Sequence, residues 1–94
     1  MILKEKEFDR VIKDNFYSQT ILVEVKGIIQ GKIRFFKADC QYNNENGILI
    51  IADLINKIKI DLASQYRIEY EEKENLIIIY LDNEQDIKLT VLEK

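Results

Sequence analysis

The sequence of 94 residues contains no histidine. This absence removes the side chain that most often serves as a general base, a proton shuttle or a metal ligand. A zinc site would have to be built from carboxylates and a single thiolate, which is a poor ligand set. We therefore expect a protein that is not an enzyme and that uses no metal and no other cofactor.

Cysteine occurs once, at Cys40, so the chain cannot form an internal disulfide. That usage is typical of proteins from reducing compartments. Cys40 is a poor candidate nucleophile because no histidine is present to activate it, and we expect a small buried side chain. Proline is absent too, so lysine, glutamate and β-bulges must protect the edges of any sheet.

Long apolar runs are also missing, since none approaches the roughly 20 residues that a membrane-spanning helix requires. Charged residues at positions 4–7 interrupt the apolar start of the chain, which is unlike a signal peptide. These features predict a cytoplasmic protein without membrane contact. The formal net charge of −3 disfavours nucleic-acid binding in general, because such proteins are more often basic.

Length and composition predict one small globular domain over residues 1–94. Its first part is helical in pattern, with Phe8, Val11, Ile12 and Phe16 recurring at spacings of three and four. Charged residues fill the positions between them. This pattern predicts an amphipathic helix over about residues 3–15 that packs its apolar face on the remaining chain.

From residue 21 onwards the apolar period changes to two, which is typical of half-buried strands. The segments that follow predict about seven strands in meander order, over residues 21–26, 32–42, 48–52, 57–62, 66–71, 76–81 and 87–91. Turn sequences separate them, and Asn46-Gly47 is the strongest of these.

The predicted strand over residues 32–42 cannot be flat. Ile33 and Phe35 fit one inward-facing set, but the alternation then shifts by one residue. The second inward set consists of Phe36, Ala38, Cys40 and Tyr42. We therefore predict a β-bulge at Phe35-Phe36, which would bend the strand as a small barrel requires.

Two charged clusters are candidate binding sites. Lys32, Arg34 and Lys37 form the most concentrated basic outward set, near Phe36 and Tyr42. Basic groups beside aromatic rings can hold a nucleic-acid backbone and stack a base, although an ordinary charged outer face is the simpler interpretation. Four glutamates between positions 69 and 74 match no calcium-loop spacing, so we expect a solvated hairpin end there.

Several features of the first half of the chain together resemble the first motif of the Sm/LSm family. They are the helix, the sequence VEVKG at residues 23–27, Gly31-x-Ile33, a bent strand and Asp39-x-x-Tyr42-Asn43. The resemblance implies a mostly β fold, with an N-terminal α-helix followed by a small, strongly bent antiparallel sheet or barrel of Sm-like or SH3-like type. The family's second motif, Ile-Arg-Gly, has no counterpart, because residues 77–83 read IIIYLDN.

The same resemblance implies a ring-forming homo-oligomer that is joined through strand edges and binds single-stranded RNA. Asp39 would orient the binding loop, Tyr42 would stack on a base and Asn43 would form a hydrogen bond with its edge. Lys32 and Arg34 would lie near this site.

One alternative fold and one alternative function remain open. The run of strand segments over residues 47–92 also fits a PH-like barrel, although that fold usually ends in a helix. The alternative function is a protein-interaction or self-assembly module without nucleic-acid binding, which requires no basic surface. A small-molecule cofactor is expected for neither function, and self-association through strand edges would serve both.

Overall fold

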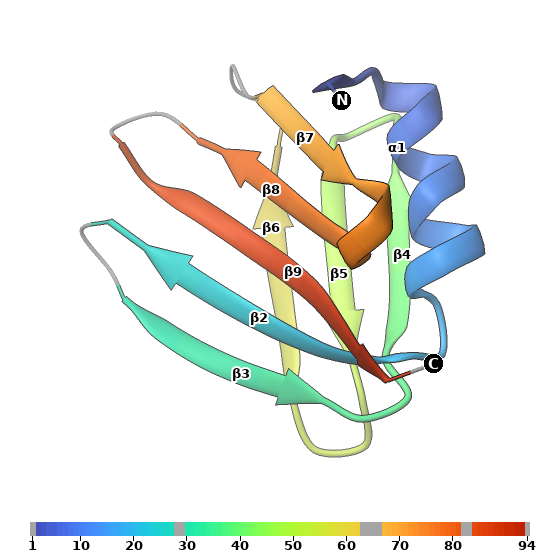
Figure 1. Cartoon of the computed structure of the whole chain (residues 1–94), viewed down its shortest axis with the longest axis vertical. Helices are drawn as coiled ribbons and strands as arrows, with labels where there is room; N and C mark the ends of the chain where they lie inside the picture. Colours follow the sequence, from blue (N-terminus) through green and yellow to red (C-terminus); the bar gives the residue numbers. More distant parts are fainter. Residues whose placement is uncertain (1, 28–29, 63–66, 82–83, 94) are drawn as a thin grey trace.

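The computed structural model describes residues 2–27, 30–62, 67–81 and 84–93 (Figure 1). A short strand β1 (Ile2–Leu3) precedes helix α1 (Glu5–Val11), which continues as a π-helical turn η1 (Ile12–Phe16). Eight strands and a 3-10 turn follow: β2 (Thr20–Lys26), β3 (Gly31–Phe35), β4 (Asp39–Asn43), β5 (Ile48–Ala52), β6 (Lys57–Asp61), β7 (Arg67–Glu71), η2 (Glu72–Glu74), β8 (Leu76–Tyr80) and β9 (Asp86–Glu93).

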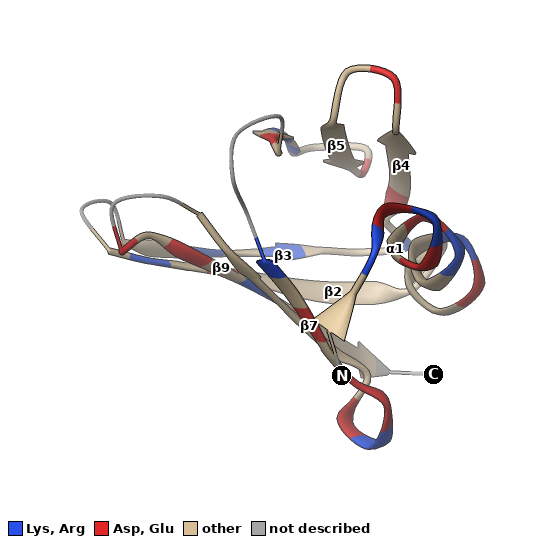
Figure 2. Cartoon of the chain, turned by 90° about the horizontal axis from the view of Figure 1, so that it is seen from above, with Lys and Arg blue, Asp and Glu red and all other residues tan. Residues whose placement is uncertain are grey.

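The strands form two antiparallel sheets that lie in separate layers (Figure 2). The large sheet has six strands in the order β1-β7-β8-β9-β2-β3, and the small sheet has three in the order β4-β5-β6. β9, the last strand, pairs with β2 along almost its whole length inside the large sheet, whereas β1 lies at the edge of that sheet beside β7. In the described residues the two sheets are not closed into one barrel.

The N-terminal helix is present as predicted, over residues 5–16 rather than about 3–15. The backbone N–H of Lys4 donates to Glu7 Oε1 at 3.1 Å, which caps the first turn. Phe8, Ile12 and Phe16 are buried, so the apolar stripe packs on the sheets as its period requires. Among the described residues, no helical segment has the length and apolar character needed to cross a membrane.

The prediction of a mostly β fold with one N-terminal helix and antiparallel sheets is confirmed. The described chain contains β1 in addition to the predicted strands, and the segment over residues 32–42 is divided in two. Tyr66, which was assigned to the start of a strand, lies outside the described residues.

The prediction of a β-bulge at Phe35-Phe36 is wrong, although the alternation of inward-facing and outward-facing side chains does shift at this place. β3 ends at Phe35 in the large sheet and β4 begins at Asp39 in the small sheet, so residues 36–38 carry the chain around a corner. Lys37 has a φ of 51°, the left-handed conformation that turns the backbone here. A change of sheet therefore produces the shift in alternation.

Backbone hydrogen bonds outside the two strands hold this corner. The N–H of Ala38 donates to Gln19 O at 2.8 Å, and the N–H of Ser18 donates to Ala38 O at 2.7 Å. Ala38 is buried as predicted, whereas Phe36 is exposed and not part of the inward set. Phe36 points away from the core because it lies in the corner, where neither sheet covers it.

Candidate interaction surface

The five residues predicted to contact RNA lie on strands of two different sheets. Lys32 and Arg34 are exposed on β3, the outer strand of the large sheet. Asp39 begins β4 and Asn43 ends it, in the small sheet. Asn43 and Tyr42 line a groove beside β4, and neither Lys32 nor Arg34 lines it. The described structure therefore does not gather the five side chains into one site.

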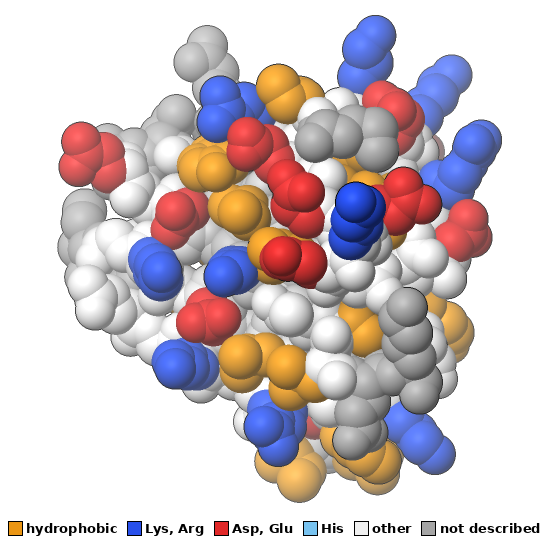
Figure 3. Space-filling view, in the orientation of Figure 1, with side chains coloured by type: hydrophobic (Ala, Val, Ile, Leu, Met, Phe, Trp, Pro, Cys, Tyr) orange, Lys and Arg blue, Asp and Glu red, His pale blue; other side chains and the backbone are white. Residues whose placement is uncertain are grey.

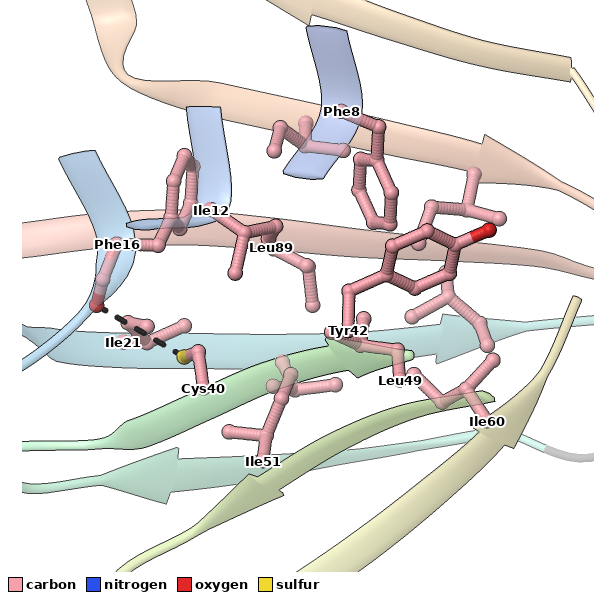
Figure 4. Close-up of a cluster of buried hydrophobic side chains, with 14 of the residues drawn as sticks. Phe8, Ile12, Phe16, Ile21, Cys40, Tyr42, Leu49, Ile51, Ile60 and Leu89 are labelled. Carbon is pink, nitrogen blue, oxygen red and sulfur yellow. Dashed lines mark hydrogen bonds between the residues drawn. The ribbon is translucent and has the colours of Figure 1, made fainter. Parts of the chain in front are cut away.

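Tyr42 belongs to the core (Figure 4). Its ring packs edge-on against Phe8, with the ring centroids 4.9 Å apart and the planes at 75°. Its hydroxyl donates to Glu5 Oε1 at 3.0 Å, and the residue is only 9% exposed. Little of the Tyr42 ring is therefore accessible for the predicted stacking on a base, and that role stays a prediction.

Asn43 and Asp39 are exposed, but the side chain of Asn43 is used in its own turn. Its Oδ1 accepts a hydrogen bond from the N–H of Glu45 at 2.9 Å, and its backbone O accepts from Gly47 at 2.8 Å. Asp39 Oδ1 accepts from Gln41 Nε2 at 3.5 Å on the outer face of the small sheet. Asn43 thus has a structural role that sequence reasoning did not assign to it.

Cys40 is a buried thiol, as expected. Its Sγ lies 3.8 Å from Phe16 O, the contact drawn as a dashed line in Figure 4. Burial raises the pKa of the Cys40 thiol to about 12, and the charge of Asp39 adds to the effect. The thiol is therefore protonated at neutral pH and is not an activated nucleophile.

The outer face of the large sheet carries acidic, basic and apolar side chains close to one another (Figure 3). Glu69 illustrates how these charges compensate one another. Its carboxylate accepts from the Tyr80 hydroxyl at 3.2 Å and from Arg67 at 3.3 Å. The Arg67 guanidinium also lies 4.7 Å from the centre of the Tyr80 ring. This face is typical of a solvated sheet surface.

The most exposed large apolar side chains of the described residues are those of Leu54, Ile55 and Phe36, with relative exposures of 104%, 89% and 63%. Leu54 and Ile55 occupy the turn between β5 and β6, and Phe36 occupies the corner between β3 and β4. We call these three residues the apolar tip. Figure 1 places this turn at the lower end of the molecule, where Figure 3 shows apolar side chains beside basic ones.

Asp53 holds the two parts of the apolar tip in place. Its Oδ1 accepts from the N–H groups of Asn56 at 2.6 Å and Ile55 at 2.8 Å, and its Oδ2 accepts from the N–H of Phe36 at 3.1 Å. These hydrogen bonds, that of Asn56 first, lower the pKa of the Asp53 carboxyl below its ordinary value. The carboxylate is therefore ionised at neutral pH and fixes the turn.

Basic residues surround the apolar tip. Lys37 Nζ lies 5.8 Å from the centre of the Phe36 ring, and Lys57 is exposed at the start of β6. Arg34 is exposed two residues before Phe36. Sequence reasoning treated residues 53–56 only as a break between strands. The available signal was two large aliphatic residues, Leu54 and Ile55, in a turn where polar residues are usual.

A groove with acidic walls lies between α1 and the turn after β7. Its volume is about 710 Å³, and we call it the acidic groove. It is lined by the acidic residues Glu7, Asp14 and Glu72, the apolar residues Leu3, Val11 and Val91, and a basic residue, Arg10, together with Tyr70, Asn15, Gln19 and Asn75.

Tyr70 forms hydrogen bonds at the inner side of the acidic groove. Asn15 Nδ2 donates to its hydroxyl oxygen at 3.3 Å, and the hydroxyl lies 3.5 Å from Asn75 Oδ1. Burial raises the pKa of the Tyr70 phenol, and the charge of Glu72 raises it further. The described residues include no group of three or more histidine, cysteine, aspartate or glutamate side chains placed to hold a metal ion.

Comparison of the chain with protein-family models, curated proteins and solved structures gave no match. The resemblance to the Sm/LSm family therefore rests on the sequence motif alone. The function has to be argued from the geometry of the apolar tip and of the surfaces around it.

Proposed function

We propose that this domain is a non-enzymatic self-assembly module whose copies associate through the apolar tip. The observation that carries the proposal is that Leu54 and Ile55 are almost completely exposed. Removing apolar surface from water is favourable by about 25 cal/mol per Å², before the entropic cost of association is subtracted. A cluster of large exposed apolar side chains with a polar rim is typical of interaction sites.

The hydrogen bonds of Asp53 support this proposal because they fix the backbone of the tip before any partner arrives. Three N–H groups, from two separate segments of the chain, converge on one carboxylate. A surface that is already ordered loses less conformational entropy on binding than a mobile loop does. The tip is thus both apolar and preorganised, a combination that favours association.

Association through strand edges, as expected from the sequence, stays a prediction. The basic side chains on the edge strands favour association through the tip instead. β3 carries Lys32 and Arg34 on its outer face, and β6 carries Lys57 and Lys59. Two copies that paired through the same edge would place basic side chains near basic side chains. Like charges across a strand pair are destabilising, and lysine commonly protects exposed edges.

Sedimentation velocity from micromolar to millimolar concentration tests the proposed function. We expect the wild-type protein to associate with rising concentration, and the Leu54→Asn/Ile55→Asn variant to remain a monomer. Ile2→Asn is the matched control, because Ile2 is also exposed but lies on β1, at the edge of the large sheet opposite β3. A wild-type protein that stays monomeric throughout, or a tip variant that associates equally well, would contradict the proposal.

A second function, binding of single-stranded RNA by an Sm-like ring, is favoured by one observation. Phe36 is an exposed aromatic ring with Lys37 beside it and Arg34 two residues away. In this version of the hypothesis Phe36, rather than Tyr42, stacks on a base. The assembly would repeat a weak site and so strengthen binding.

Filter binding to oligo-U at low and high salt tests this second function. We expect binding at low salt that weakens with added salt, because phosphate contacts release counterions. Phe36→Ala should weaken binding, whereas Ile2→Ala, at the opposite edge of the large sheet, should not. Absence of binding at low salt would contradict RNA recognition and would leave self-assembly untouched.

A further inference from the structure

The apolar tip and the acidic groove have complementary charge and chemistry. We propose that the acidic groove of one copy receives the apolar tip of a second copy, so that the copies join head to tail. This inference rests on the proposed function, since it names the surface to which the same tip binds. It assigns a partner surface to a groove that has no other role in the structure described above.

The tip and the groove are apart within one copy. Figure 1 shows the β5–β6 turn at the lower end of the molecule, whereas α1 and the turn after β7 lie higher and on the right. The hydrogen bonds of Asp53 also hold the tip at its own end of the small sheet. A contact between tip and groove must therefore join two different copies.

Basic and acidic side chains are distributed along the chain as a contact between the tip and the groove requires. Residues 31–60, which include the tip, carry five basic and three acidic side chains. Residues 61–94 carry four basic and nine acidic side chains. Locally, the basic residues Arg34, Lys37 and Lys57 outnumber Asp53, the carboxylate that binds the tip. The groove is lined by Glu7, Asp14 and Glu72. Opposite charges at the rim of an apolar contact steer association and fix its register.

The apolar parts also match. Leu3, Val11 and Val91 supply apolar surface inside the groove, to which Leu54 and Ile55 can be transferred from water. The groove has a volume of about 710 Å³ and is open to solvent, so two aliphatic side chains have room to enter it. One base, Arg10, lines the groove and leaves it with a net negative charge.

Other pairings of the same surfaces fit less well. A contact of tip with tip would bring Lys37 and Lys57 of two copies together, which like-charge repulsion opposes. The second groove, beside β4 and β5, has a volume of about 720 Å³ and is lined by both signs of charge: Asp9, Glu45, Lys13 and Lys59. It offers no net attraction for a basic tip, so charge selects the acidic groove.

A contact between two different surfaces is heterologous, and repeated copies then form a ring if the rotation closes or an open filament if it does not. Such a contact can be tested by complementation. The tip variant Leu54→Asn/Ile55→Asn keeps its groove, and the groove variant Asp14→Lys/Glu72→Lys keeps its tip. All four positions are exposed, so both variants should fold like the wild type.

We expect each variant alone to sediment as a monomer, while an equimolar mixture forms a dimer that does not grow further. The control variant Glu71→Lys/Glu74→Lys changes the net charge equally at two exposed positions that do not line the groove, and it should associate like the wild type. A monomeric mixture, or a groove variant that associates normally, would overturn the head-to-tail contact while self-assembly through the tip survives. A wild-type protein that never associates would instead overturn the proposed function itself.

Discussion

The backbone N–H of Phe36 donates a hydrogen bond of 3.1 Å to Asp53 Oδ2, across seventeen residues of sequence. The other oxygen of the same carboxylate accepts from Ile55 and Asn56 in the β5–β6 turn. One side chain therefore ties the corner between the two sheets to the end of the small sheet. This link holds the backbone of Phe36 beside the turn that carries Leu54 and Ile55.

Replacing Asp53 should loosen the tip without unfolding the domain. Asp53→Ala leaves the N–H groups of Phe36, Ile55 and Asn56 without their acceptor, so we expect faster hydrogen exchange at these three amides. Exchange in β9, which is paired on both sides, should not change. Asp39→Ala is the control, and unchanged exchange at the three amides in the Asp53 variant would contradict the role of Asp53.

The same carboxylate makes the tip sensitive to acid. The pKa of Asp53 is lowered from its ordinary value of 3.8, so its contribution is fully present above that pH. The contribution decreases as the pH falls below that value and is lost once the pH passes below the lowered pKa. An NMR titration should show the Phe36 amide shift following the Asp53 carboxyl at a pH below 3.8. Titration at or above this value would contradict the hydrogen bonds.

The thiol of Cys40 should be unreactive in the folded protein. Its pKa is raised from 9.0 to about 12, which lowers the thiolate fraction at neutral pH by about a thousandfold. Burial additionally blocks access of a reagent. We expect slow modification by a disulfide reagent under native conditions and rapid modification in denaturant. Rapid labelling of the native protein would show that Cys40 is not in the core.

The ring of Tyr42 should matter for stability. Tyr42→Phe removes the hydrogen bond to Glu5 and should lower the free energy of unfolding by about 1 kcal/mol. Phe8→Ala removes the ring that contacts Tyr42 and leaves a cavity, so it should lower the free energy of unfolding by about 3–5 kcal/mol. Urea unfolding measures both values. A Phe8→Ala variant as stable as the wild type would contradict the packing described here.

Removing the charges of β3 should create a new mode of association. Lys32→Val/Arg34→Val leaves an outer strand with apolar side chains, which favours pairing between copies. In the background of the tip variant we therefore expect renewed association, measured by light scattering. Lys4→Val/Lys6→Val, on exposed positions outside β3, is the matched control. If the β3 variant stays monomeric, its lysine and arginine do not protect the edge.

Local patterns in the sequence predicted the elements of the fold well. The stripe of Phe8, Ile12 and Phe16 marks the helix because helix periodicity is a local property. Strand positions follow from alternation for the same reason. The division into two sheets depends instead on contacts between distant residues, such as the hydrogen bonds that join Ala38 to Ser18 and Gln19. Alternation alone cannot distinguish a bulge from a change of sheet.

The site was less predictable than the fold. Tyr42 follows a family motif, but its environment is set by Phe8 and Glu5, which are distant in sequence. Leu54 and Ile55 lie between two predicted strands, but the sequence does not show whether their side chains fold back onto the core or face solvent. Their position became clear only from the β5–β6 turn and from Asp53, which binds a backbone group of the neighbouring corner.

The central claim is that copies associate through the apolar tip. Amide shifts recorded at increasing protein concentration measure this directly, residue by residue. We predict shift changes or line broadening at Phe36, Leu54 and Ile55, together with changes around Asp14 and Glu72 in the groove. Changes confined to β3, or spectra that do not depend on concentration, would contradict the account.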